Sequence, residues 1–422
     1  METIALRLHG AGKASLDTFE LPPAGDDEIL ARIICDSLCM SSYKAYIQGS
    51  AHKRVPDDID INPVILGHEC CGEIVSVGRK WSKKYSPGDR FALQPQVVYR
   101  GCIDGPGYSY PYMGGDATYV VIPFPVMEMD CLLPYRSDTF FYGALAEPYS
   151  CVVGSFDEMF HTRAADHHHY MGNREGGRMA ILAGGGPMGY AALDYITNCE
   201  RKPSLVVVTD IDAGRIDHLS RVAETGSVRT LFIKTDGTCN DADILMKPTD
   251  GKGYDDILVM APSASLIETA DRLLAENGCL SFFAGPADRG LTASVNFHSV
   301  HYNSTHIIGS VGGNAEDMRK VIDMMEKGLL HPSAMISHVG GLSCAAEATA
   351  NLPGIPGAKK LIYNQISMPL TALADLEELG REDGFYRGLA EIVSSNGGVW
   401  CPEAEKYLLG NAPSIQPEGR RD

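Results

Sequence analysis

Residues 179–200 read MAILAGGGPMGYAALDYITNCE, an apolar run followed by spaced glycines and then by a segment with helical spacing. Three of the glycines spell G-x-G-x-x-G between the predicted strand and the predicted helix. In that context the first permits a tight turn, the second lets a pyrophosphate approach the backbone, and the third allows close helix packing. The phosphates are expected at the helix N-terminus. The predicted cofactor-binding residues here are Gly184, Gly186, Pro187, Met188 and Gly189.

An acidic residue follows at the distance expected of NAD-binding proteins. Asp210 ends the apolar run LVVVTD, about 20 residues beyond the last glycine of the motif. Its carboxylate is expected to accept the ribose hydroxyls and to repel a 2′-phosphate, so the sequence favours NAD(H) over NADP(H). Arg215 lies nearby and keeps NADP(H) open as the alternative cofactor.

Around this motif, strand-like apolar runs alternate with amphipathic helical runs. The alternation predicts an α/β Rossmann domain with a doubly wound sheet of six parallel strands, at residues 154–313. Strands are expected at 179–184, 205–210, 231–235, 255–261, 279–285 and 306–313, and helices at 187–200, 213–226 and 263–278.

The rest of the chain has a different pattern. Residues 1–153 contain short β-like runs broken by Gly, Pro and Asp, which predicts a β-rich, irregular domain. The segment 161–178 is polar and turn-rich, so the domain boundary is expected beside it. Residues 314–365 supply a helix and a closing strand that are expected to return to the first domain, and residues 366–422 are expected to form a helical C-terminal extension.

Composition narrows the class of partner. The formal net charge of −18 disfavours nucleic acid and anionic membrane surfaces. The twelve cysteines are scattered without CxxC pairs, which does not indicate a disulfide framework. The N-terminus lacks the basic start of a signal peptide, and no apolar run reaches the roughly 18 residues of a membrane helix. We therefore expect a cytoplasmic protein that acts on a small molecule.

Four residues from separate segments are candidate metal ligands. Thiolate, imidazole and carboxylate all suit zinc, and catalytic zinc takes three protein ligands and keeps one position open. Each residue alone has an ordinary structural explanation, such as a buried cysteine or a helix-start glutamate. Their combination upstream of a dinucleotide motif predicts a catalytic zinc site formed from Cys39, His68, Glu69 and Glu147.

These residues carry a resemblance to the zinc-containing medium-chain dehydrogenase/reductase family, over residues 1 to about 365. The resemblance implies a GroES-like first domain, a homodimer or homotetramer, and zinc-assisted hydride transfer. The similar segments are DSLCMSSYK (36–44), GHECCGEIVSVG (67–78), GGDATYVVIP (114–123), LAEPYS (145–150) and AGGGPMG (183–189).

The resemblance also implies roles for further residues. Ser41 is the expected proton relay, Glu69 is a second catalytic candidate, and Gly285, Pro286 and Ser310 are expected to hold the nicotinamide. Zinc would act on the substrate oxygen as a Lewis acid.

This sequence departs from the family pattern at two places. Ser42 stands where the family often has aspartate, so the orientation of the metal ligands is expected to differ. Only Cys102 remains of the four-cysteine structural lobe, so one zinc is expected per chain.

A narrower resemblance, to ketose-phosphate reductases of this family, implies the substrate. It rests on HKRVPDD (52–58), PGYSYP (106–111) and VNFHSVHY (295–302). The expected pair is L-sorbose 1-phosphate and D-glucitol 6-phosphate. A sugar phosphate needs cationic donors, for which Lys44, Lys53 and Arg54 are candidates.

Three alternatives stay open at this point. An unphosphorylated polyol or alcohol dehydrogenase would share the family and the zinc. A zinc-free quinone or enoyl reductase on the same fold would use NADPH. A catalytically silent dinucleotide-binding protein that senses redox ratio would need neither the metal nor a proton relay.

Overall fold

The computed structural model describes residues 1–163, 165–238, 241–286 and 288–417. Within it the chain forms two compact units. The first contains Met1–Glu147, Met318–Glu326 and the chain from Pro332 onward, and the second contains Pro148–Asp317 and Lys327–His331. The domain limits predicted above stay a prediction, because compact packing does not show which parts fold independently.

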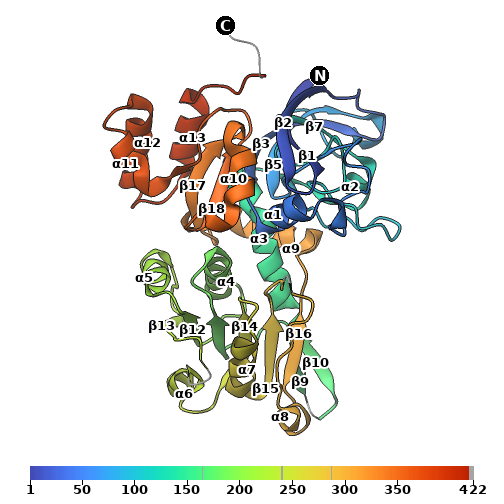
Figure 1. Ribbon diagram of the computed structural model, residues 1–422. Helices are drawn as coiled ribbons and strands as arrows, with labels where there is room; N and C mark the ends of the chain where they lie inside the picture. The colour runs from blue at the N-terminus through green and yellow to red at the C-terminus, as the bar shows by residue number, and fades with distance from the viewer. Residues whose placement is uncertain (164, 239–240, 287, 418–422) are drawn as a thin grey trace. The chain divides into compact units, whose positions relative to one another are not determined.

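The second unit contains the predicted Rossmann sheet (Figure 1). Its six strands run parallel in the order β13-β12-β11-β14-β15-β16, which confirms the predicted fold class. β12 is buried at every position, as expected of a parallel strand covered on both faces. The strands are β11 (Arg178–Leu182), β12 (Leu205–Asp210), β13 (Arg229–Lys234), β14 (Tyr254–Val259), β15 (Leu274–Phe282) and β16 (His306–Gly309), and the helices are α4 (Pro187–Asn198), α5 (Ala213–Val222), α6 (Asp241–Leu245), α7 (Ala264–Leu273) and α8 (Phe297–Tyr302).

Two segments of this unit differ from the expectation. The helix predicted over 263–278 ends at Leu273, because the next residue already pairs with Tyr254 in the sheet and Asn277 has a positive φ of 58°. The segment 161–178, expected to be turns, contains an antiparallel hairpin of β9 (Phe160–Arg163) and β10 (His168–Met171).

The first unit is β-rich, as predicted. A three-stranded sheet has the order β2-β1-β4, and an eight-stranded sheet has the order β19-β17-β18-β3-β5-β6-β8 with β7 paired to β3. The strands are β1 (Glu2–Gly10), β2 (Lys13–Glu20), β3 (Ile29–Ser37), β4 (Val64–Ile65), β5 (Cys70–Val77), β6 (Arg90–Leu93), β7 (Tyr119–Ile122), β8 (Leu132–Tyr135), β17 (Ile336–Gly341), β18 (Lys359–Tyr363) and β19 (Thr371–Ala372). β18 pairs antiparallel with β3, which joins the end of the chain to its beginning.

The helices of the remaining chain are α1 (Met40–Gln48), α2 (Phe124–Glu128), α3 (Phe140–Asp157), α9 (Ala315–Glu326), α10 (Ala345–Asn351), α11 (Leu376–Leu379), α12 (Gly384–Ser395) and α13 (Pro402–Asn411). α11, α12 and α13 form the red group of helices in Figure 1. Trp400, which lies just before α13, is fully buried. The C-terminal segment is therefore packed into the first unit rather than attached to its surface.

No helix in the described part of the chain is long and apolar enough to cross a membrane. The eleven cysteines in that part are all free, in agreement with the absence of a disulfide framework. Cys239 lies outside the described residues.

Candidate metal centre and dinucleotide site

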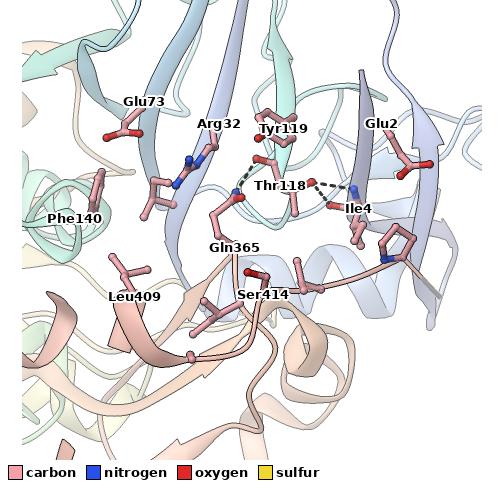
Figure 2. A pocket seen from close by; sticks show the side chains of 15 residues that line it. Glu2, Ile4, Arg32, Glu73, Thr118, Tyr119, Phe140, Gln365, Leu409 and Ser414 are labelled. Carbon is pink, nitrogen blue, oxygen red and sulfur yellow. Dashed lines mark hydrogen bonds between the residues drawn. The ribbon is translucent and has the colours of Figure 1, made fainter. Parts of the chain in front are cut away.

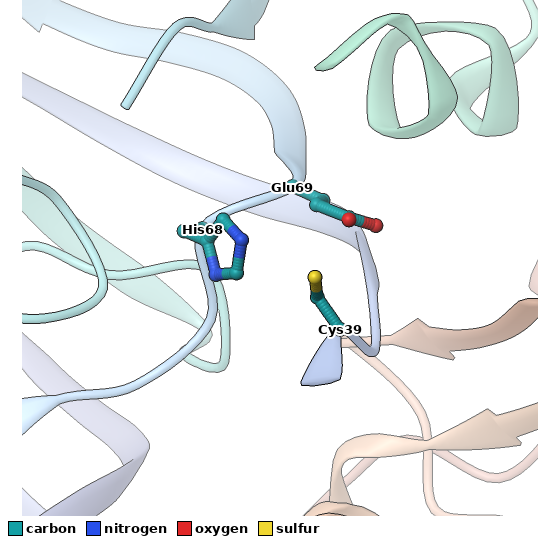
Figure 3. A group of neighbouring side chains, drawn as sticks. All are labelled: Cys39, His68 and Glu69. Atoms are coloured by element: carbon teal, nitrogen blue, oxygen red, sulfur yellow. The ribbon is translucent and has the colours of Figure 1, made fainter. Parts of the chain in front are cut away.

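Three of the predicted metal ligands lie together in the first unit (Figure 3). Cys39 stands directly before α1, and His68 and Glu69 stand directly before β5. One ligand atom from each residue lies within 4.8 Å of the other two. His68 and Glu69 are buried, and Cys39 is half-buried. The loop that ends β3 and the loop that begins β5 are therefore what bring the three donors into one place.

Hydroxyl groups orient the His68 ring. The Ser42 Oγ lies 3.0 Å and the Tyr108 hydroxyl 3.1 Å from His68 Nδ1. Burial, together with the smaller effects of the positive charges of Lys359 and Arg54, lowers the pKa of His68 to about 3. The imidazole is therefore neutral, which is the form that binds a metal. Ser42 thus places a neutral hydroxyl beside the ring, and the expected difference in ligand orientation stays a prediction.

A buried lysine that the sequence analysis missed pairs with Glu69. Lys359 Nζ lies 2.6 Å from Glu69 Oε1 and also contacts Oε2. Burial alone would lower the pKa of Lys359, but Glu69 and Cys39 raise it above its usual value. Two consecutive lysines in the otherwise apolar strand AKKLIYN were the available signal, since charged residues are seldom buried unless paired.

Glu147 lies near the same cluster without belonging to the group of three. It is buried in α3, and its charge acts on both Cys39 and Lys359. Burial raises the pKa of Cys39 to about 12, with Glu69 and Glu147 adding to the rise. A thiolate is therefore disfavoured here without a cation, and the donor set fits zinc.

The charges of the predicted substrate cations act on a second histidine, His52. Arg54, Lys53 and Lys44 all lower the pKa of His52, after the larger effect of burial. Lys53 is exposed, whereas Lys44 and Arg54 are half-buried.

Tyr108 connects this cationic group to the candidate metal centre. Its ring stacks on His52 with centroids 5.5 Å apart, and the Arg54 guanidinium lies 5.5 Å from the ring centroid. Ser41 contributes a hydrogen bond to the Tyr108 side chain. The sequence analysis assigned no role to His52 or Tyr108. They could have been found from the sequence, because they lie in HKRVPDD and PGYSYP, two of the segments that carry the narrower resemblance.

The glycine loop of the second unit has the shape that phosphate binding requires. A Cβ at Gly189 would lie 2.0 Å from the Gly184 carbonyl oxygen, so only glycine permits this approach of α4 to the loop. A Cβ at Gly186 would meet nothing within 4 Å, which leaves open space in front of the helix. Pro187 and Met188 occupy the first two positions of α4, where proline has no N–H to leave unpaired and the Met188 N–H has no partner within the helix.

Asp210 lies at the end of β12, next to the glycine loop. Its Oδ2 accepts a 3.0 Å hydrogen bond from Gly185 N–H and its Oδ1 one from Asp212 N–H, also 3.0 Å. Each oxygen retains a lone pair for a further donor. Arg215 packs beside Gly185, because a Cβ atom added to Gly185 would lie 2.9 Å from the Cβ of Arg215. The exposed Arg215 guanidinium forms a weak ion pair with Asp212.

The remaining cofactor candidates follow the last two strands of the sheet. Gly285 and Pro286 come after β15, and Ser310 comes directly after β16. These strands run parallel to β11, so all the predicted cofactor residues share the carboxyl edge of the sheet. Ligands of doubly wound sheets bind at that edge.

Comparison with known proteins identifies the family. Residues 25–128 match the alcohol dehydrogenase GroES-like domain, and residues 187–327 match the zinc-binding dehydrogenase domain. An L-sorbose 1-phosphate reductase of Klebsiella pneumoniae is 44% identical over 413 residues, which cover 98% of each chain. The chain belongs to the zinc-containing medium-chain dehydrogenase family.

Two further similarities concern substrate type and fold. A mannitol-1-phosphate 5-dehydrogenase of Aliivibrio fischeri is 42% identical over 415 residues, 97% of each chain. A solved structure from Sinorhizobium meliloti, bound to NADP, has a TM-score of 0.71 at 20% identity and covers 86% of this chain and 99% of its own. Membership of the family makes this chain an oxidoreductase of the zinc-dependent alcohol and polyol dehydrogenase type.

Proposed function

We propose that this medium-chain dehydrogenase transfers a hydride between NAD(H) and a phosphorylated ketose or hexitol, with L-sorbose 1-phosphate and D-glucitol 6-phosphate as its preferred pair. The observation that carries the proposal is the group of Cys39, His68 and Glu69, whose ligand atoms lie within 4.8 Å of one another. A glycine loop suited to a pyrophosphate, in the second unit, supplies the other half of the reaction.

In this proposal Cys39, His68 and Glu147 bind one zinc, and Glu69 stays paired to Lys359. Because Ser42 and Tyr108 contact His68 Nδ1, Nε2 is the nitrogen available to the metal. The formal charges of one zinc, one thiolate, two glutamates and Lys359 cancel, which is the condition for burying them together. Glu69 is the alternative third ligand.

A bound zinc supplies a Lewis acid for the substrate oxygen. Ser41 then moves the proton, since its hydroxyl both accepts and donates and lies two residues from Cys39. Tyr108 keeps its own proton, because burial raises the pKa of its hydroxyl well above the usual value. We assign Tyr108 to holding His68 rather than to proton transfer.

Arg54 supports a phosphorylated substrate over a neutral polyol. Its Nε is buried without a hydrogen-bond partner among the described residues. No carboxylate in that part of the chain forms an ion pair with it, whereas its positive charge reaches His68. A phosphate oxygen would satisfy this donor, and both sugar-phosphate relatives act on phosphorylated hexoses or hexitols by their names.

An activity panel tests the proposal. Purified protein is assayed with NADH and NADPH against L-sorbose, L-sorbose 1-phosphate and fructose 6-phosphate, with zinc measured in the same sample. We expect NADH-dependent reduction of L-sorbose 1-phosphate and one zinc per chain. Full activity of Cys39→Ala would support a zinc-free reductase. Cofactor binding without any turnover would support the redox sensor.

Two variants separate the substrate and cofactor assignments. Arg54→Met is expected to raise KM for the sugar phosphate at least ten-fold, whereas Lys83→Met, at an exposed lysine outside this cationic group, leaves it unchanged. Equal effects on a neutral sugar would remove the phosphate assignment. Asp210→Ala is expected to reduce the preference for NADH over NADPH, and an unchanged preference would show that this carboxylate does not select the cofactor. A homodimer or homotetramer in the cytoplasm remains the expected state, measurable by light scattering.

A further inference from the structure

A carboxylate from the C-terminal segment caps the helix that carries Glu147. Glu405 Oε2 accepts a 2.6 Å hydrogen bond from Phe140 N–H, and Glu405 Oε1 accepts a 2.8 Å bond from Phe141 N–H. These two groups open α3, where N–H groups have no partner within the helix. A negative charge at this end also interacts favourably with the helix dipole. Glu405 therefore caps the N-terminus of α3, although it is distant from this helix in the sequence.

Glu405 is itself held firmly. It lies in α13 and is 2% exposed. The Tyr363 hydroxyl donates to its Oε1 over 2.9 Å, and Trp400 Nε1 donates to the Tyr363 oxygen over 3.0 Å. Tyr363 belongs to β18, the strand that also carries Lys359. One strand thus carries the partners of both Glu69 and Glu405.

The C-terminal segment is also tied down beyond α13. Ser367 N–H donates to the Pro413 carbonyl over 2.8 Å, and Ile366 and Ser414 form a β-bridge. The end of this segment and Phe140 line one cavity of the first unit, with Phe140 and Leu409 at the same end of it (Figure 2). None of the predicted site residues lines that cavity. The contact between α13 and the start of α3 is therefore fixed from both sides of Glu405.

Helix α3 depends on its first turns to place Glu147. Glu147 lies seven residues after Phe140, about two helical turns along the same face. Pro148 follows at once inside the helix. Proline has no N–H to donate to the carbonyl one turn earlier, so the helix is weakened just where Glu147 stands. Anchoring of the N-terminal end compensates for that loss.

We propose that Glu405 is a positioning residue for Glu147, and that fixing α3 in this way is the purpose of the C-terminal segment. The inference rests on the proposed function, in which Glu147 is a zinc ligand. Loss of the cap lets the first two turns of α3 shift, so the Glu147 carboxylate moves relative to Cys39 and Lys359, on which its charge acts.

The test compares Glu405→Gln and Glu405→Asp with Glu403→Gln in the intact zinc protein. Glu403 is an exposed acid on the same helix and serves as the matched control. A glutamine side chain can accept a hydrogen bond from one of the two N–H groups, but its NH2 group faces the other N–H, and two donors cannot pair. An aspartate keeps both acceptor oxygens and the charge. Four quantities are measured at a temperature where all variants are folded: zinc affinity by chelator competition, kcat, KM, and the visible spectrum of the cobalt-substituted protein.

For Glu405→Gln we expect roughly ten-fold weaker zinc binding, a fall in kcat larger than the change in KM, and a shifted cobalt spectrum. Glu405→Asp should recover part of each effect, and Glu403→Gln should match the parent protein. A lower melting temperature with unchanged zinc affinity and cobalt spectrum would reduce Glu405 to a structural residue and overturn the inference.

Glu147→Gln, measured in parallel, separates this inference from the function it rests on. If that variant binds zinc as the parent does, Glu147 is not a ligand and the proposed ligand set is wrong. If it loses zinc while Glu405→Gln keeps zinc, the ligand set stands and only the positioning role fails.

Discussion

Ser42 illustrates how one side chain orients a metal ligand. Its hydroxyl lies 3.0 Å from His68 Nδ1, where the family pattern often has an aspartate. A hydroxyl brings no charge, so here the tautomer of the imidazole is set by the hydrogen bonds that Nδ1 forms with the neutral hydroxyls of Ser42 and Tyr108. Groups that fix the second nitrogen of a metal-bound histidine usually matter to metal affinity almost as much as ligands do.

We therefore expect Ser42→Ala to weaken zinc binding roughly ten-fold, because the buried ring loses one of its two orienting contacts. Zinc competition with a chelator measures this. Ser50→Ala, just after α1, is the control, since the Ser50 hydroxyl bonds the Pro56 carbonyl, far from the His68 ring in the sequence. Equal affinity in Ser42→Ala and the parent would assign the orientation to Tyr108 alone.

Lys359 and Glu69 form a buried pair whose partners depend on each other. Removing one partner of such a pair typically costs about 3–5 kcal/mol. We expect Lys359→Met to lower the free energy of urea unfolding by an amount in this range, and the double variant with Glu69→Gln to recover most of it. A double variant as unstable as the single one would show that lost packing, rather than the unpaired charge, is responsible.

At this scale the sequence indicated Cys39, His68 and Glu69, because adjacent residues and a short motif mark them. Lys359 and Glu405 were not predictable, because their partners lie about 290 and 265 residues away. Contacts between residues so far apart in the sequence depend on which strands pair in the sheet, and a single sequence does not reveal that pairing.

Helices and strands were predictable where apolar residues recur in a clear pattern and a turn-forming residue ends the segment. The parallel strands of the second unit satisfy both conditions. The end of α7 does not, since residues 274–278 fit a helix by composition and become strand only through pairing with β14. The hairpin β9–β10 is exposed, so its polar residues resemble a loop.

The stability of helix α3 depends on pH, because the residue that caps it, Glu405, is an acid. Burial raises the pKa of Glu405 to about 7, against the opposing effect of the N–H groups of Phe140 and Phe141. Glu405 therefore caps α3 as a charged carboxylate above about pH 7 and is protonated below that pH. Because its pKa is higher in the folded than in the unfolded state, its contribution to the free energy of unfolding is greatest below about pH 4.5 and falls as the pH rises to about 7.

The stability difference between the parent protein and Glu405→Gln should therefore shrink by up to about 3 kcal/mol between pH 4.5 and pH 7.5. Urea unfolding of both proteins across this range measures it. A difference that stays constant would mean that Glu405 keeps one protonation state throughout.

For the whole molecule, composition and spacing predicted two parts, an α/β half and a β-rich half, and the structure agrees. The net charge of −18 also predicted that an anionic substrate needs local donors. Arg54, Lys53 and Lys44 around His52 are such a group.

Removal of the metal should affect the stability of the first unit as well as activity. A ligand at a thousand times its Kd stabilises the folded state by about 4 kcal/mol. We expect chelation to lower the melting temperature by roughly 5–10 °C, and readdition of zinc to restore it. Chelator should leave the melting temperature of Cys39→Ala unchanged. A similar drop in that variant would indicate a second metal.

The pairing of β18 with β3 has a consequence for synthesis in the cell. A ribosome that adds about 5–20 residues per second needs tens of seconds to proceed from β3 to β18. During that time the nascent chain exposes an unpaired strand edge, and Glu69 has no counter-charge. The metal centre therefore completes only near the end of translation, so a truncated translation product would contain the zinc donors without a finished site, and would be a natural client for chaperones.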